Sequence, residues 1–164
     1  MKTTLAFLVG ATMLGGTAFA QVATPTDKAF VAKVSQGGMF EVMAGQLATT
    51  RGSTQDIRDF AIAEVHDHML VGDRLKQIST QEGIALAPAL NAEFSTELAH
   101  LSSLAGRAFD AEYLAQMGTL HDADGAAFAT EATAGGSPAY RAFGAETHPI
   151  VQRHIGAIRA VPVG

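Results

Sequence analysis

Turn-forming residues divide this chain into long stretches whose apolar residues recur three and four positions apart, the spacing of α-helices. Gly and Pro lie between the stretches, and few segments show the alternation typical of strands. The pattern predicts an all-α chain, with long helices at about 28–50, 54–81, 107–132 and 139–160 and a short helix at about 92–104. It favours an antiparallel four-helix bundle, in which the short helix follows the second long helix and closes one end.

The predicted helix ends carry capping residues. Thr24 and Pro25 precede the first helix, Ser53 is positioned to cap the second, and Gly83 is expected to follow its end. The clearest break is Gly-Gly-Ser-Pro at 135–138, which combines a flexible turn, a cap and a Pro at the first helical position. These signals indicate short connections between neighbouring helices.

Residues 1–20 have the pattern of a secretory signal peptide. Lys2 is followed by an apolar run and then by Ala18-Phe19-Ala20, which fits the small-x-small cleavage rule. Residues 21–164 are therefore expected to form a single exported domain, either periplasmic or associated with the outer membrane. No later apolar run approaches the roughly 18 residues of a membrane span, so no transmembrane segment is expected in the mature chain.

The composition excludes some partners and ligands. The net charge of −5 becomes −6 when Lys2 is removed, and such acidity argues against binding to nucleic acid or anionic membrane surfaces. The chain has no cysteine, which rules out disulfides and thiolate ligands. Any metal ion would have to be held by nitrogen and oxygen atoms.

Ionisable residues occupy the apolar faces of all four long helices. In the second helix, steps of three and four residues from Phe60 lead through Glu64 and His68 to Val71. Unpaired charges are costly to bury, so such residues must be paired, neutral or bound to metal. This mixture of donors suits a divalent transition metal (zinc, iron, manganese or copper). The predicted site consists of Glu41, Glu64, His68, His121 and His154.

A second interpretation explains the same residues without a metal. The inward Glu and His side chains could form a hydrogen-bonded network that fixes helix register in a non-catalytic envelope protein, which acts through its surface on an envelope partner. In either case the inward histidines are expected to be neutral, so that acid would destabilise the fold. His66, Asp67 and His100 are expected at the surface, with a supporting role beside the site as the alternative for His66 and Asp67, and the role of His148 stays open.

Sequence motifs give the chain a family resemblance. They are FEVMAGQLA at 40–48, the Asp-His pair at 67–68, FDAEYLAQM at 109–117 followed by His121, and P-x-x-x-x-H at 149–154. With these motifs the chain resembles the exported bacterial domain-of-unknown-function family 4142, whose members are often labelled predicted outer membrane proteins. The resemblance implies a ferritin-like helical bundle and picks out Glu41, His68, His121 and His154.

Sequence motifs exclude some functions of this chain but do not identify one. The di-iron pattern of ferritins needs Glu-x-x-His on two helices, whereas Glu64 and His68 are four residues apart. No nucleophile motif, phosphate loop or cofactor fingerprint is present in the sequence, so whether the protein is an enzyme stays open. The leading hypothesis is an exported metal-binding bundle with a role in metal handling or envelope stress.

Overall fold

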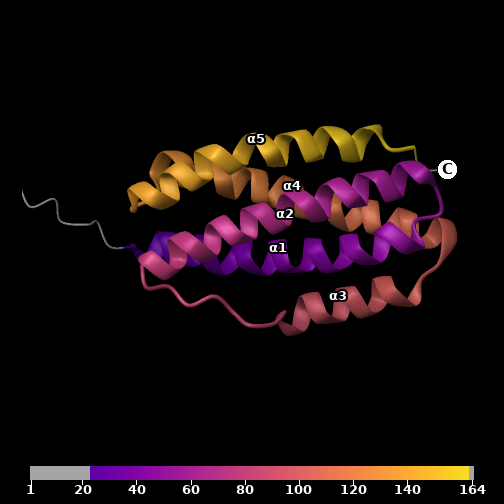
Figure 1. Cartoon of the computed structure of the whole chain (residues 1–164), viewed down its shortest axis with the longest axis horizontal. Helices are drawn as coiled ribbons and strands as arrows, with labels where there is room; N and C mark the ends of the chain where they lie inside the picture. Colours follow the sequence, from indigo (N-terminus) through magenta and orange to yellow (C-terminus); the bar gives the residue numbers. More distant parts are fainter. Residues whose placement is uncertain (1–22, 163–164) are drawn as a thin grey trace, which may run out of the picture.

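The computed structural model describes residues 23–162, and all regular secondary structure in that range is helical. The signal peptide predicted at residues 1–20 lies outside the described residues. The helices, shown in Figure 1, are α1 (Pro25–Arg51), α2 (Gln55–Gln81), α3 (Ala92–Ser103), α4 (Gly106–Ala134) and α5 (Pro138–Ala160). The predicted all-α architecture is confirmed, with boundaries shifted by a few residues.

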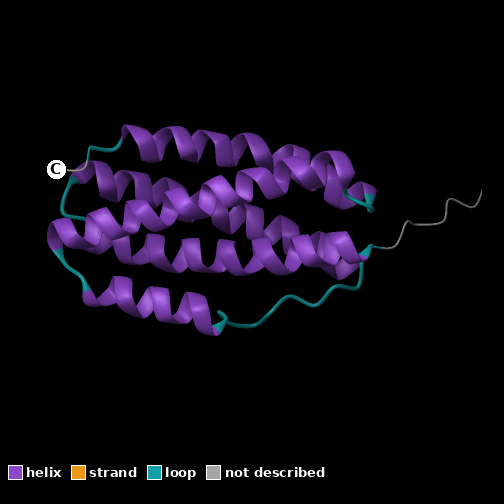
Figure 2. Ribbon diagram, turned by 180° about the vertical axis from the view of Figure 1, so that it is seen from behind, coloured by secondary structure: helices purple, strands orange, loops and turns teal. Residues whose placement is uncertain are grey.

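The four long helices form two hairpins that pack into a bundle. The most extensive contacts join α1 to α2 and α4 to α5, and further contacts of α1 with α4 and of α2 with α5 close the bundle. The short helix α3 does not close an end of the bundle, as the sequence suggested. It lies along the outside of α1, where Phe94 stacks on Phe40 with ring centroids 5.0 Å apart. The connection at 82–91 runs back along the bundle and places α3 there (Figure 2).

Side-chain caps set the helix ends. Thr24 and Asp27 form a reciprocal capping box at the start of α1, and Ser137 caps α5 with Pro138 at the first position. The expected cap of α2 is wrong, because Thr54 rather than Ser53 caps this helix. The backbone N–H of Ser53 donates instead to Asp110, over 3.0 Å, and so ties the α1–α2 turn to α4.

The apolar core has two parts with a polar layer between them. One part contains the packed rings of Phe30, Phe128 and Phe143, and the other contains residues such as Phe40 and Tyr113. Along α4, the buried residues of one part end at Met117 and those of the other resume at Phe128. The segment between them carries His121, and the equivalent gap in α2 carries Glu64 and His68. The polar layer therefore lies inside the bundle.

A second buried acidic group lies where α1 approaches the α4–α5 turn. The carboxylate of Asp27 is buried and accepts hydrogen bonds from the backbone N–H groups of Gly136 and Ser137. Glu131 is also buried beside it. Burial and the neighbouring Asp27 raise the pKa of Glu131 to about 7. Ionisation of Glu131 therefore lowers the free energy of unfolding, whereas the protonated side chain has no such cost.

Replacing this acid with an amide should stabilise the protein above neutral pH. Because the pKa of Glu131 is raised from 4.5 to about 7, its ionisation lowers the free energy of unfolding progressively between these pH values, and the loss is complete at pH 8. We expect Glu131→Gln to gain about 2 kcal/mol at pH 8 and almost nothing at pH 4.5. Urea unfolding at both pH values measures this difference. An equal effect at the two pH values would show that the charge of Glu131 is not responsible.

Candidate metal centre

Three of the four long helices bring four ionisable side chains to one buried point. Glu64 and His68 come from successive turns of α2, His121 comes from α4, and His154 comes from α5. Glu64 and His121 are 0% exposed, His154 is 3% exposed and His68 is 8% exposed. One ligand atom from each of these residues can be chosen so that all four lie within 4.8 Å of one another. This His₃Glu cluster could hold a metal ion, and its inward-facing residues are those that the helical periodicity predicted.

The separations within the His₃Glu cluster are those of a compact coordination site. His121 Nε2 lies 3.3 Å from His68 Nε2 and 3.1 Å from His154 Nδ1. Oε2 of Glu64 lies 3.2 Å from His121 Nε2 and 3.3 Å from His68 Nε2, and its Oε1 lies 2.8 Å from His154 Nδ1. Tetrahedral zinc with bonds of about 2.0–2.1 Å would separate its ligand atoms by about 3.3 Å. These separations are therefore close to those around a zinc ion, and all four ligand atoms lie within 4.8 Å of one another.

Two of the imidazoles use their other nitrogen as a hydrogen-bond donor to oxygen. His121 Nδ1 lies 2.9 Å from the carbonyl oxygen of Met117, one turn earlier in α4. His154 Nε2 lies 2.9 Å from Oδ2 of Asp67, which also accepts a hydrogen bond of 2.7 Å from Arg153. Because a carbonyl or carboxylate oxygen only accepts, these ring nitrogens carry the hydrogens. In the neutral rings, the nitrogens that face the cluster are therefore unprotonated.

Neutral imidazoles would leave several electron-pair acceptors facing one another. The unprotonated nitrogens of His121 and His154 meet at 3.1 Å. Both oxygens of Glu64 are buried, and neither receives a hydrogen bond of good geometry from any residue in the described part of the chain. Buried acceptors without a donor are costly, so the cluster needs either a metal ion or extra protons at its centre.

Glu41 lies behind the His₃Glu cluster rather than within it. Its Oε2 lies 3.1 Å from His68 Nδ1 and its Oε1 lies 3.4 Å from His121 Nδ1, which are the ring nitrogens turned away from Glu64. Glu41 is buried, and neither of its oxygens has a hydrogen-bond partner among the described residues. It is thus placed as a carboxylate that orients ligating imidazoles, an arrangement common around metal-bound histidines.

The remaining histidines lie outside the cluster. His66 and His100 are exposed, and His148 is partly buried and contacts Gln152. Asp67 takes the supporting position that the sequence left as an alternative, because contacts with His154, His66 and Arg153 outweigh its partial burial and lower its pKa to about 2. His66 contacts the far oxygen of Asp67 at 3.1 Å, which makes it a neighbour of the site and not a member.

Without a metal, the carboxylates favour protonation of the histidines. Burial alone would lower the pKa of His121, but its contact with Glu64 and the charges of Glu41 and Glu64 raise it to about 9. The same two carboxylates overcome burial and raise the pKa of His68. Burial would raise the pKa of Glu64, but the three imidazoles hold it well below its usual value. The expectation of neutral inward histidines is therefore wrong for His121 in the metal-free protein.

The sequence matches a family described as a domain of unknown function (DUF4142) over residues 12–161. The chain belongs to the DUF4142 family. This match covers the whole bundle and confirms the resemblance drawn from the motifs. The family description names no activity, so the chemistry of this DUF4142 chain has to be argued from its own side chains.

A solved structure shares the fold of this DUF4142 chain. It is the crystal structure of a DUF305 fragment from Deinococcus radiodurans, with a TM-score of 0.73 and 15% sequence identity over 84% of this chain and 95% of that one. At this identity the likeness shows the fold alone. No curated protein matches the chain. Within the described residues, no helix is both long and apolar enough to cross a membrane.

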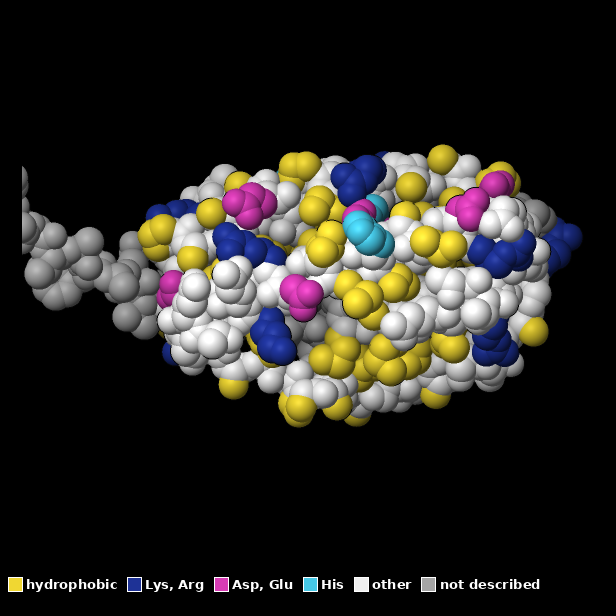
Figure 3. All heavy atoms as spheres, viewed as in Figure 1, with side chains coloured by type: hydrophobic (Ala, Val, Ile, Leu, Met, Phe, Trp, Pro, Cys, Tyr) yellow, Lys and Arg dark blue, Asp and Glu magenta, His cyan; other side chains and the backbone are white. Residues whose placement is uncertain are grey.

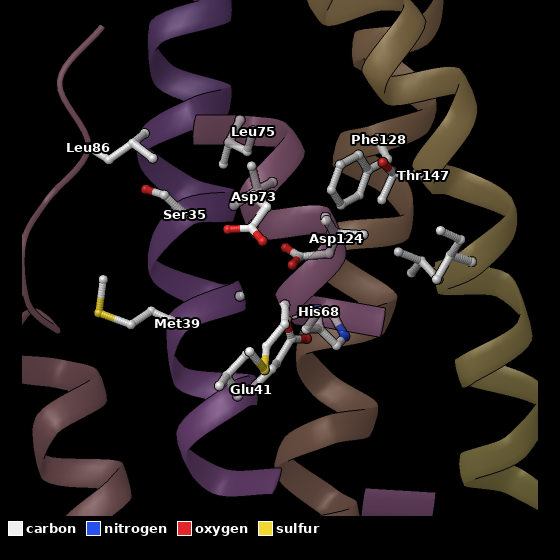
Figure 4. A pocket seen from close by; sticks show the side chains of 18 of the residues that line it. Ser35, Met39, Glu41, His68, Asp73, Leu75, Leu86, Asp124, Phe128 and Thr147 are labelled. Atoms are coloured by element: carbon white, nitrogen blue, oxygen red, sulfur yellow. Dashed lines mark ion pairs between the residues drawn. The ribbon is translucent and has the colours of Figure 1, made fainter. Parts of the chain in front are cut away.

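A pocket of about 320 Å³ reaches the His₃Glu cluster of this DUF4142 protein from the surface. Glu41, His68 and Asp124 are among its lining residues (Figure 4). Sequence reasoning missed Asp124, although it follows His121 by three residues and so shares its helix face. Burial and the charge of Glu41 raise the pKa of Asp124 to about 7, against the opposing charge of Lys33.

Proposed function

We propose that this protein binds one divalent transition-metal ion, with zinc as the best-fitting ion, through Glu64, His68, His121 and His154. The observation that carries the proposal is the meeting of the ring nitrogens of His121 and His154 with the buried Glu64 carboxylate, which receives no hydrogen bond of good geometry from the described residues. A cation at their centre satisfies all of these acceptors at once. The hydrogen-bonded alternative needs additional protons at the same point.

The donor set narrows the choice of metal. Three imidazoles and one carboxylate suit zinc, copper or iron better than manganese, which favours oxygen ligands. The spacing of about 3.3 Å supports tetrahedral coordination, the usual geometry of zinc with four protein ligands. Zinc is therefore the ion with which the site should first be tested.

The same donor set supports a role in holding the metal. Sites with four protein ligands and little exposure are typical of structural zinc, whereas catalytic zinc keeps a position open for water or substrate. We propose a metal-handling role in the bacterial envelope, to which the predicted signal peptide would direct the protein. No catalytic residue is assigned.

Metal analysis of the untagged protein tests this proposal. After incubation with zinc and desalting, elemental analysis should find about one zinc per chain in the wild type and close to none in His68→Ala. His66→Ala is the matched control, because His66 is two positions away and its side chain is 70% exposed. It should retain about one zinc. Wild-type protein that retains no zinc, copper, iron or manganese would overturn the proposal in favour of the protonated network.

The position of Glu41 predicts a smaller effect than loss of a ligand. If Glu41 orients the imidazoles of His68 and His121 from behind, Glu41→Gln should weaken zinc binding about 10–100-fold while keeping one zinc per chain. Competition against a chromophoric chelator measures the affinity. Glu64→Gln, which removes a charged ligand, should weaken binding further. Equal losses in the two variants would identify Glu41 as a fifth ligand.

A further inference from the structure

The pocket of about 320 Å³ lies between α1, α2, α4 and α5 and has mainly apolar walls. Its apolar lining residues include Val34 from α1, Leu75 from α2, Phe128 from α4, and Phe143 and Val151 from α5. Hydrophobic side chains also gather in the middle of the face shown in Figure 3, beside α1 and α2. A cavity of about 150 Å³ holds one benzene ring, so this pocket has room for a ring with a short chain.

The inner end of the pocket is acidic. Figure 4 shows the carboxylate of Asp124 turned into the pocket above Glu41 and His68. Asp124 is 4% exposed. Its ion pair with Lys33 spans 3.9 Å, and that lysine is half exposed. Glu41 adds a second carboxylate whose oxygens lack hydrogen-bond partners within residues 23–162.

We propose that this pocket binds a small organic cation, a primary ammonium group on a short aromatic or aliphatic chain. The ammonium group would donate hydrogen bonds to Asp124 and balance the negative charge of this end of the pocket, and the chain would pack between Val34, Phe128 and Phe143. An anionic ligand would face the carboxylates of Asp124 and Glu41, and a neutral one would bring no positive charge to Asp124. The proposal goes beyond metal binding and does not require the metal.

Three probes of equal size separate charge from shape. They are 3-phenylpropylamine, 3-phenylpropan-1-ol and 3-phenylpropanoate, titrated by NMR into the untagged protein at pH 8. We expect the amine to bind at least about tenfold more tightly than the alcohol, since one charged hydrogen bond is worth about 1.5–3 kcal/mol. The carboxylate should not bind measurably. Equal affinity for all three probes, or no binding of the amine, would overturn the proposal.

Two variants locate the binding. Asp124→Asn keeps the shape of the side chain and should lower the affinity for the amine to that for the alcohol. Gly72→Leu should abolish binding of both probes, because Gly72 lines the pocket and an added Cβ there meets no atom within 4 Å. Replacing a helical Gly also favours the helix, so this variant should fold. Unchanged amine binding in either variant would overturn the proposal.

Measuring the zinc content of the same variants distinguishes failure of the cation pocket from failure of the metal site. Neither Asp124 nor Gly72 belongs to the His₃Glu cluster, so both variants should retain the zinc stoichiometry of the wild type. The titrations are repeated with chelator-treated protein, in which the amine should still bind. Wild-type protein that binds zinc but not the amine would reject the cation pocket alone. Wild-type protein that binds the amine but not zinc would reject the metal site alone.

Discussion

Zinc should raise the melting temperature of the metal-free protein by roughly 10 °C when its free concentration is about a thousand times the dissociation constant. Such an excess stabilises the folded state by about 4 kcal/mol, and for a chain of this size each kcal/mol is worth about 2–4 °C. The ion adds this stability because it binds the folded cluster of Glu64, His121 and His154 and not the unfolded chain. Differential scanning calorimetry with and without zinc measures the shift.

The zinc-induced shift, rather than the melting temperature itself, is the quantity to compare between variants. His121→Ala removes the imidazole that contacts both other histidines, and it should abolish the shift even if it also changes the basal stability. His100→Ala is the matched control, since this exposed histidine lies in α3 away from the cluster, and it should keep the full shift. A wild-type protein whose melting temperature does not respond to zinc has no such site.

The metal-free protein should lose stability as the pH rises from about 6.5 to 9. The pKa of His121 is raised to about 9 by Glu64 and Glu41, which more than offset its burial. Because this pKa is raised, the protonated His121 ring contributes its full share of the folding stability below about pH 6.5, and this share is lost as the pH approaches 9. The loss is at most about 3 kcal/mol. Urea unfolding of chelator-treated protein at pH 6.5, 7.5 and 9 measures it.

Zinc should reverse this pH dependence. The ion competes with protons for the imidazole nitrogens, so its binding strengthens as the pH rises and the gap between loaded and metal-free protein widens. Using the Glu131→Gln background removes another group whose pKa is raised to about 7. A metal-free protein that became more stable between pH 6.5 and 9 would show that the imidazoles are neutral, as the sequence alone had suggested.

Periodicity alone was enough to identify which side of each long helix faces inward. Glu64 and His68 fall on the stripe that continues through Leu75, and all three are buried. His121 and His154 likewise share faces with buried aromatic residues of their helices. The reason is physical: the α-helix turns by a fixed angle at each residue, so spacing along the sequence fixes direction around the axis. The number and order of the helices followed from equally local signals.

Other features could not be predicted because they depend on how separate elements meet. Ser53 was a suitable cap by type, yet its hydrogen bonds go to Asp110 in a helix more than 50 residues later. The position of α3 depends on the path of the 82–91 connection and on the contact of Phe94 with Phe40. Neither contact can be predicted from the neighbouring residues in the sequence, because each joins residues more than 50 positions apart.

The sequence by itself determined the bundle, the inward direction of the histidines and the absence of thiolate ligands. Only the tertiary structure decided that Glu64, His68, His121 and His154 meet at one point, that Glu41 lies behind them, and that Asp124 lines a pocket beside them. Direction around a helix is set by local geometry, whereas depth along the bundle depends on the packing of one helix against another. A shift of one turn, about 5.4 Å, would have separated these side chains beyond the reach of a single ion.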